Sequence, residues 1–374
     1  MPIRYFDYQA TTPLDPQVYA VMRPWLEDYF GNPHSAHSLG TRANAGMTVG
    51  LEQLAGCFNC RPDDIIITSG ATESNNLALK GVMEAAEGDR RELIVAQSEH
   101  SCTLAAMQDL RARGFVAHEI PIRKDGQVDL ETLRRLISPS CALVSVMAVH
   151  NEIGTVAPIK TIGEIARANG ALYHCDAAQA VVAMDLDLKS LPIDLLSISG
   201  HKCYGPKGVG ALIMRPEITL HPQIHGGGQQ RGIRGGTQAP WMTVALAEAV
   251  QISQARRLES LAHMTQMRDF LLQRLQDKSV RFEINGSMVE RFVGNLNLTF
   301  VDVYGNRLHN GLRQFAVSSG SACAAMSGRP SQTLKALGRS RKDLMSTLRI
   351  GFSHLTKEED VLALADAIAD VISG

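Results

Sequence analysis

Ile65-Ile66-Ile67-Thr68-Ser69-Gly70-Ala71-Thr72 joins an apolar run to a glycine turn, and a helical pattern opens directly after it. The run is continuous rather than alternating, as in a strand that is covered on both faces of its sheet. Similar runs follow, and helical patterns lie between several of them, for example at residues 130–137 and 159–169. The further runs are residues 93–96, 142–146, 171–173, 194–197 and 209–213. This alternation predicts an α/β domain with a mostly parallel sheet.

Polar side chains come directly after these runs. They are the segment 69–74, Glu99 with His100, Asn151, Asp176, and His201 with Lys202. Ligands of open α/β sheets bind outside the carboxyl ends of the strands, so we expect these residues to share one crevice. Ordinary strand-end caps and turns would explain any one of them, but not the whole set.

Composition excludes several classes of protein. The 374 residues carry 37 basic and 38 acidic side chains, a balance that argues against a protein built mainly to coat nucleic acid or an anionic membrane. No apolar stretch approaches 18 residues, and residues 1–7 lack the apolar region of a signal peptide. Seven scattered cysteines do not form a secreted disulfide framework. We expect a soluble, reduced, cytoplasmic protein.

The last third of the chain has a different pattern. Residues 241–277 are helical in pattern and long enough to bridge two domains. Beyond them, strand-like segments at 281–284 and 296–301 mix with helical ones. This mixture predicts a smaller α+β region.

One helix N-terminus and three single residues suggest cofactor chemistry. The N–H groups of the helix after Gly70, with the hydroxyls of Thr72 and Ser74, suit a phosphate, although Ser, Thr and Gly also cap ordinary helices. Lys202 follows a buried strand and could form a Schiff base, whereas an isolated lysine is usually a solvated charge. Asp176 could hold a pyridinium nitrogen protonated. His100 could stack on such a ring or move protons, or be a satisfied structural histidine.

Two residues nearer the C-terminus suggest substrate chemistry. Cys323 stands in the small-residue segment Ser318-Ser319-Gly320-Ser321-Ala322-Cys323, where a thiol is more reactive than the usual buried cysteine. Arg349 interrupts an apolar run and needs a partner. That partner is either a substrate carboxylate or an internal Asp or Glu.

Two other motifs point elsewhere but are weak. Cys57 and Cys60 have C-x₂-C spacing, yet no second such pair completes a four-cysteine zinc site, so we interpret them as incidental cysteines near a helix end and predict no metal. The sequence His225-Gly226-Gly227-Gly228 is typical of a hydrolase oxyanion loop. No G-x-S-x-G elbow accompanies it, which argues against a serine hydrolase.

The combined pattern resembles the cysteine desulfurases, pyridoxal 5'-phosphate (PLP) enzymes of fold-type I in the class V aminotransferase superfamily. Within them it looks like the group whose loop has the form Ser-Ser-Gly-Ser-Ala-Cys. The resemblance runs almost the whole length, with its motifs in the family's order. They are residues 6–12, 31–33 with Ser35 and His37, 69–76, 151–154, 176–179, 199–202, 225–228, 231–237 and 318–323.

The resemblance implies a two-domain homodimer. Residues 12–258 would form a large PLP-binding domain around a mostly parallel seven-stranded sheet. Residues 1–11 and 259–374 would form a smaller α+β domain that carries the catalytic cysteine loop, at about residues 317–331.

It also implies a role for each matching residue. Lys202 would bind the cofactor covalently, His100 would stack on its ring and act as acid and base, and Cys323 would be the nucleophile. The remaining cofactor contacts would come from Asp176 at the pyridine nitrogen, Gln179 at the ring hydroxyl oxygen, Asn151 in the pocket wall, Ala71, Thr72, Ser199 and His201 at the phosphate, and Thr237 from the other subunit. Asn32 and Arg349 would bind the substrate carboxylate.

The implied reaction converts L-cysteine to L-alanine and leaves the sulfur on Cys323 as a persulfide. An acceptor protein would take it, in iron–sulfur cluster assembly or in nucleic-acid sulfur modification such as tRNA thiolation or DNA phosphorothioation. No direct nucleic-acid or membrane partner is expected. The alternatives are a selenocysteine lyase, another aminotransferase-like enzyme of this fold type, and a catalytically idle dimer that serves as an assembly partner.

Three positions depart from the family pattern. Arg329 stands where an acidic residue is expected, the chain ends at Gly374 soon after its last helical pattern, and Gly235 replaces a common Ser. The first two bear on the acceptor, and we expect a specialised recipient such as a nucleic-acid sulfur-modification pathway.

Overall fold

The larger part of the molecule is built around a seven-stranded sheet. The computed structural model describes residues 3–301, 303, 305–319 and 331–373. The strands are β2 (Ile65–Thr68), β3 (Glu92–Ala96), β4 (Val116–Ile120), β5 (Cys141–Ser145), β6 (Leu172–Asp176), β7 (Leu195–Ser199) and β8 (Gly210–Met214). Their order is β2-β8-β7-β6-β5-β3-β4, and only β8 runs antiparallel to its neighbours. The predicted mostly parallel sheet is confirmed.

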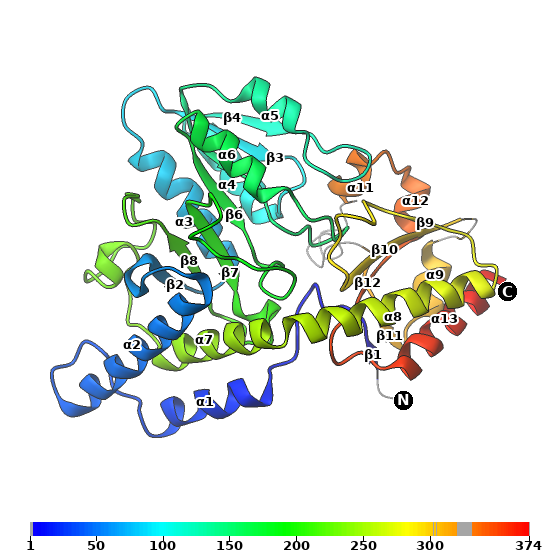
Figure 1. The fold of residues 1–374 in the computed structure, drawn as a ribbon, viewed down its shortest axis with the longest axis horizontal. Helices are drawn as coiled ribbons and strands as arrows, with labels where there is room; N and C mark the ends of the chain where they lie inside the picture. Colours follow the sequence, from blue (N-terminus) through cyan, green and yellow to red (C-terminus); the bar gives the residue numbers. More distant parts are fainter. Residues whose placement is uncertain (1–2, 302, 304, 320–330, 374) are drawn as a thin grey trace.

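The apolar runs of the sequence became strands because both faces of the sheet are covered. β5, β7 and β8 are buried at every position. The covering helices include α3 (Ala71–Ala85), α4 (Ser101–Ala112), α5 (Leu130–Leu136) and α6 (Ile159–Ala168) (Figure 1). β4 was missed because it is the edge strand, paired with β3 alone, and only its last residue is buried.

A pair of helices joins the two parts of the molecule. The predicted helical stretch 241–277 consists of α7 (Pro240–Ala255), which packs with α1 (Pro16–Glu27) and α2 (Ser38–Phe58), and α8 (Arg257–Asp277). The break is at Arg256, whose guanidinium pairs with Asp15 at 2.9 Å. From there α8 runs across to the smaller part (Figure 1).

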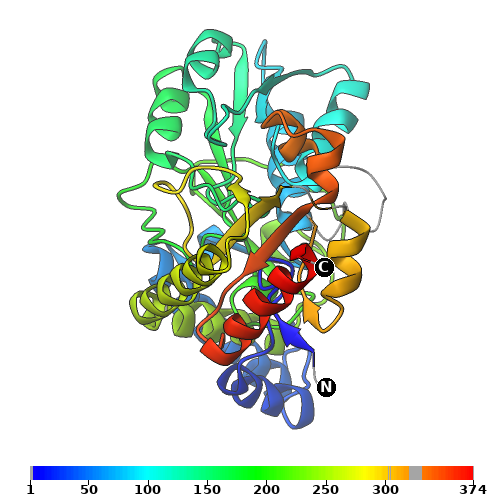
Figure 2. The same cartoon turned by 90° about the vertical axis from the view of Figure 1, so that its right-hand side faces the viewer.

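The smaller part combines an antiparallel sheet with short helices. Its strands β9 (Phe282–Ile284), β10 (Asn295–Phe300) and β12 (Thr347–Gly351) lie in the order β12-β10-β9, and β1 (Arg4–Tyr5) pairs in parallel with β11 (Phe315–Ala316). The helices are α9 (Gly305–Gly311), α11 (Gln332–Ala336), α12 (Arg341–Met345) and α13 (Glu358–Ser373). The N-terminal strand therefore lies among C-terminal elements (Figure 2).

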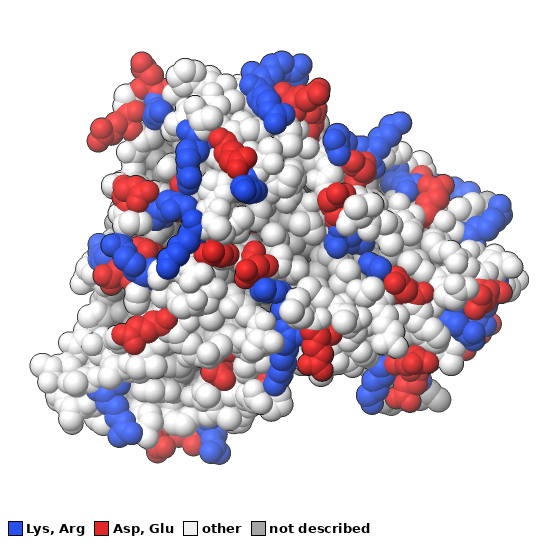
Figure 3. Space-filling model, viewed as in Figure 1, with Lys and Arg blue, Asp and Glu red and all other residues white. Residues whose placement is uncertain are grey.

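The surface is mixed in charge. On the face shown in Figure 3, basic and acidic side chains are interspersed. No helix of the described residues has both the length and the apolar character needed to cross a bilayer.

Candidate active site

A cavity of about 500 Å³ lies where the strands of the larger sheet end. This volume falls within the range of small-molecule sites. Its lining draws on all five predicted strand ends, since it includes Ser69 to Thr72, His100, Asn151, Asp176, and His201 with Lys202. The expected shared crevice is confirmed. Glu99 is an exception, because it is buried outside this lining.

One end of the cavity is suited to an anion. Gly70 is the N-cap of α3 with φ 147°, a conformation that L side chains rarely adopt. Because glycine has no side chain, the first N–H groups of α3 are left for a ligand. Ala71, Thr72, Ser199 and His201 line the same cavity. Ser74, however, is fully buried with its hydroxyl 2.8 Å from Thr68 Oγ1, so the expectation that it serves the phosphate is wrong.

Asp176 lies deep in the cavity at the end of β6. Its side chain is fixed on both oxygens, since Asn75 Nδ2 donates to Oδ2 at 2.7 Å and the Ala178 N–H donates to Oδ1 at 2.9 Å. No sequence motif predicts this role for Asn75. The available signal was an amide in the buried stripe of α3, beside Ser74 and Leu77.

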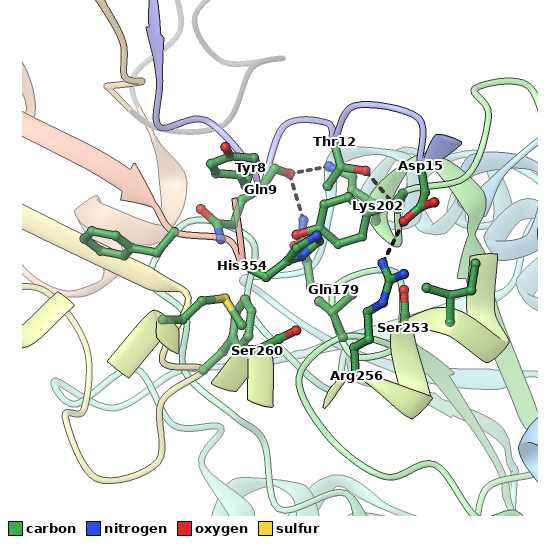
Figure 4. A pocket seen from close by; sticks show the side chains of 16 residues that line it. Tyr8, Gln9, Thr12, Asp15, Gln179, Lys202, Ser253, Arg256, Ser260 and His354 are labelled. Carbon is green, nitrogen blue, oxygen red and sulfur yellow. Dashed lines mark hydrogen bonds and ion pairs between the residues drawn. The ribbon is translucent and has the colours of Figure 1, made fainter. Parts of the chain in front are cut away.

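Lys202 stands on a short 3₁₀ turn (Gly200–Lys202) directly after β7. Its Nζ donates to the backbone carbonyls of Gln9 and, at 2.9 Å, Ala10. Gln179 Nε2 donates to the same Gln9 carbonyl at 2.9 Å. Figure 4 shows Lys202 and Gln179 meeting beneath the N-terminal segment, in the wall of a second, rear cavity of about 30 Å³. That volume holds water but no larger ligand.

His100 caps helix α4 at the cavity wall. Its Nδ1 accepts the backbone N–H of Cys102 at 3.3 Å and lies 3.0 Å from the Cys102 sulfur. Because Nδ1 acts as an acceptor, the neutral ring carries its proton on Nε2. His100 therefore has a defined tautomer.

Arg349 is the largest fully buried side chain of the described residues. Its Nη2 pairs with Asp7 Oδ1 at 2.6 Å, and its Nη1 donates to the Asn151 carbonyl at 3.0 Å. The arginine also lines the cavity. Arg349 therefore has the internal acidic partner, and it also faces the ligand space, so binding of a substrate carboxylate stays a prediction.

Two predicted residues are not brought to the cavity within this chain. Asn32 and Thr237 are exposed and are not part of its lining. Cys323 lies outside the described residues, as does Arg329.

The remaining sequence motifs have structural explanations. Gly235 is buried against the His225–Gly228 loop, and a Cβ on it would lie 2.7 Å from the Gly226 nitrogen. The common Ser therefore does not fit there.

Burial raises the pKa of Cys57 to about 11 and that of Cys60 to about 12, so both stay protonated thiols. The described residues contain no group of three or more side chains suited to a metal.

The residues around the cavity fit PLP. The open N-terminus of α3 suits its phosphate, the buried carboxylate of Asp176 suits its ring nitrogen, and the Lys202 amine suits its aldehyde. All three groups share one space, and the pocket is of the right size.

Comparison with known proteins gives full-length matches. A family model described as aminotransferase class-V matches residues 4–364. The cysteine desulfurase IscS of Dechloromonas aromatica (strain RCB) is 42% identical over 361 residues, covering 96% of this chain and 89% of that protein. A solved NifS-like protein superposes with a TM-score of 0.92 at 33% identity, covering 99% of both chains. A structure described as SspA in complex with cysteine gives a TM-score of 0.83 at 34% identity, covering 93% of this chain and 98% of that one.

Proposed function

The chain belongs to the class-V aminotransferase family and is a cysteine desulfurase, and on this basis we propose how its residues divide the reaction among them. The observation that supports the division is the meeting of the α3 N-terminus, Asp176 and Lys202 around one cavity. Membership of the family implies PLP, which supplies an electron sink that makes the Cα proton of a bound amino acid labile.

The cofactor-binding residues act from three sides. Ala71, Thr72, Ser199 and His201 hold the phosphate, and Asp176 keeps the ring nitrogen protonated. Lys202 attaches the cofactor covalently through Nζ. Gln179 would bond the ring hydroxyl oxygen, and Asn151 and His100, which also line the cavity, would lie beside the ring.

Proton transfer and substrate binding fall to other groups. Lys202 Nζ moves the proton at the substrate Cα, and His100 presents its Nε2–H to the cavity as an acid. Arg349 binds the carboxylate of L-cysteine. A buried guanidinium at the cavity wall supports this assignment, as does the related structure described with cysteine. Asn32 is assigned to the same carboxylate by the family resemblance alone, because it lies outside the cavity lining of this chain.

Cys323 accepts the sulfur. Its thiolate attacks the substrate sulfur, so that an S–S bond forms as the substrate C–S bond breaks. The electron pair of the C–S bond stays with the carbon, which takes up a proton and leaves as alanine. The persulfide then passes to an acceptor protein in the cytoplasm. The six described cysteines are free thiols, which supports a reducing compartment.

The acceptor is a specialised one. The proposal rests on Arg329, a basic residue near Cys323 where the family pattern is acidic. A persulfide loaded with ³⁵S on this enzyme should pass to a nucleic-acid sulfur-modification protein faster than to an iron–sulfur scaffold. Equal transfer to both would contradict it.

The working unit is a homodimer. Exposed apolar side chains gather on α1, α2 and the segments beside them, at Leu14, Tyr19, Leu26, Phe30, Leu39 and Val49. Charged side chains are sparse over this region in Figure 3. A second copy would cover these side chains and bring its Thr237 to the phosphate site.

Mixed dimers test the shared site. Thr237→Ala chains should bind PLP weakly as homodimers. Mixing them with Lys202→Ala chains should restore tight binding, because each mixed dimer then has one site with an intact Lys202 and an intact Thr237. A monomer in sedimentation, or no restoration on mixing, would exclude this arrangement.

The nucleophile is tested by alanine formation from L-cysteine with a thiol reductant. The wild type and Cys102→Ala should both form alanine, and Cys323→Ala should not. Alanine at the wild-type rate from Cys323→Ala would show that the persulfide route is wrong.

A further inference from the structure

The turn at residues 150–154, between β5 and α6, connects the larger part of the molecule to the smaller one. At its centre the Glu152 carbonyl accepts Asn297 Nδ2 at 3.0 Å and Asn295 Nδ2 at 3.3 Å. Both asparagines are fully buried on β10. The main chain of this turn is therefore fixed to the smaller sheet, which leaves the side chain of Glu152 to be explained.

The Glu152 carboxylate is buried and accepts one specific hydrogen bond. Ser331 Oγ lies 2.6 Å from its Oε2. The same Ser331 oxygen accepts the Leu334 N–H at 3.1 Å, as the N-cap of α11. Because the lone pair of Ser331 serves Leu334, its single hydroxyl proton is donated to Glu152. Burial raises the pKa of Glu152, and the hydrogen bond from Ser331 and the nearby Arg349 charge act in the opposite direction.

A second contact runs beside the first. Thr333 Oγ1 lies 3.2 Å from His150 Nε2, and the His150 Nδ1 accepts the Glu152 N–H at 3.0 Å. The start of α11 is thus held to the turn at two side chains. Ser331 is the first described residue after 320–330, the segment that includes Cys323.

The other described flank of that segment is bound to β12, and β12 contacts the same turn through Arg349. Ser318 O accepts the Arg349 N–H at 2.6 Å, and the Ser318 N–H donates to the Arg349 carbonyl at 3.2 Å. Arg349 in turn donates from Nη1 to the Asn151 carbonyl. Ser331 therefore contacts the turn directly at Glu152, and Ser318 is linked to it through Arg349 at Asn151, beside the cavity that Asn151 and Arg349 line.

We propose that Glu152 is a positioning residue for sulfur transfer, which fixes through Ser331 the chain directly after the segment that bears Cys323. The proposal rests on the role of Cys323 under Proposed function. Glu152 does not line the cavity, so it touches neither cofactor nor substrate, and its proposed effect is on the position of the nucleophile. A displacement of about 1 Å in a reacting group can cost roughly 100-fold in rate.

The test separates binding from sulfur transfer in the PLP-loaded enzyme. Glu152→Ala should lower kcat for alanine formation roughly 10-fold to 100-fold. It should leave KM for L-cysteine and the absorbance change of the cofactor on adding cysteine as in the wild type. Glu152→Gln should restore most of kcat, because its amide oxygen can still accept from Ser331.

Ser331→Ala tests the contact from the other side. It should lower kcat in the same way, and the Glu152→Ala, Ser331→Ala double variant should be no slower than the slower single variant. The matched control is Thr347→Val, which removes another buried hydroxyl of the smaller part, one that donates to the Asp343 carbonyl at 2.6 Å. It should keep the wild-type kcat.

Three results would overturn the proposal. They are an unchanged kcat in Glu152→Ala, the loss of its cofactor absorbance, and a Glu152→Gln variant as slow as Glu152→Ala.

The Cys323→Ala variant, measured in parallel, distinguishes a failure of this proposal from a failure of the proposed nucleophile. If it forms alanine at the wild-type rate, the proposed nucleophile fails. If it is inactive while Glu152→Ala is fully active, only the positioning role fails.

Discussion

Asn75 donates to Asp176 across 2.7 Å, and this contact ties helix α3 to the end of strand β6 beneath the candidate active site. Both side chains are buried, so water does not replace the bond when it is lost. The helix whose N-terminus faces the cavity is therefore coupled to the carboxylate that lies deep in the same cavity.

Replacing Asn75 with Ala should weaken both the fold and the site. A buried carboxylate left without its donor costs about 1–3 kcal/mol in the free energy of unfolding, which denaturant titration measures. The affinity for PLP should fall as well. Asn76→Ala is the control, since that amide bonds only the Thr72 carbonyl of its own helix among the described contacts. Equal stability of the two variants would contradict the coupling.

Lys202→Ala should abolish covalent cofactor attachment. Borohydride treatment of the loaded wild type should fix PLP to the chain, and the variant should release it on denaturation, because no amine stands in the place of Nζ. Lys207→Ala, which removes the other lysine of the cavity lining, should still retain PLP after the same treatment. Mass spectrometry of the intact chain decides between these results.

Arg349→Lys should raise KM for L-cysteine roughly 10-fold to 100-fold, because one ammonium replaces the two-pronged guanidinium. The spectrum of the bound cofactor should be unchanged. Arg4→Ala offers a control. It breaks an ion pair between Arg4 and Asp360, and both residues lie outside the cavity lining. A wild-type KM for Arg349→Lys would remove the arginine from substrate binding.

Glu99 should make stability depend on pH. Burial raises its pKa well above the usual 4.5, and the charge of Asp176 raises it further. The folded chain therefore keeps this proton to a higher pH than the unfolded chain. As a result, the free energy of unfolding falls as pH rises above about 4.5.

Glu99→Gln mimics the protonated side chain and should remove that loss. The variant should be more stable than the wild type at pH 8, and the difference should shrink to zero below pH of about 4. Glu52→Gln, at an exposed glutamate, should show no such trend. Thermal unfolding across the pH range measures both, and parallel curves for wild type and Glu99→Gln would refute the argument.

The sequence predicted the sheet well because covered strands need continuous apolar runs. The run 65–68 coincides with β2, and the others overlap their strands with small shifts at the ends. β4 carries His118 and Glu119 on a half-solvated edge, so its residues give no such signal. Arg256 gives no sign in the periodicity that one helical pattern divides into two helices.

The sequence predicts those site residues that come at the end of an apolar run. Asp176 and His201 were located in this way because strand ends converge by topology. The residues that hydrogen-bond to the site residues were not predictable in this way. Asn75 reaches Asp176 from another element, and Lys202 is bound by the backbone carbonyl of Gln9, a group that every residue type carries. Such contacts depend on tertiary packing and leave no local pattern.

The N-terminal segment has a consequence for biosynthesis. Arg4 pairs with Asp360, 356 positions later in the chain, and β1 is completed only by β11. The Gln9 and Ala10 carbonyls that hold Lys202 belong to this same segment. A ribosome must therefore deliver nearly the whole polypeptide before these carbonyls are secured, although the larger sheet can form earlier.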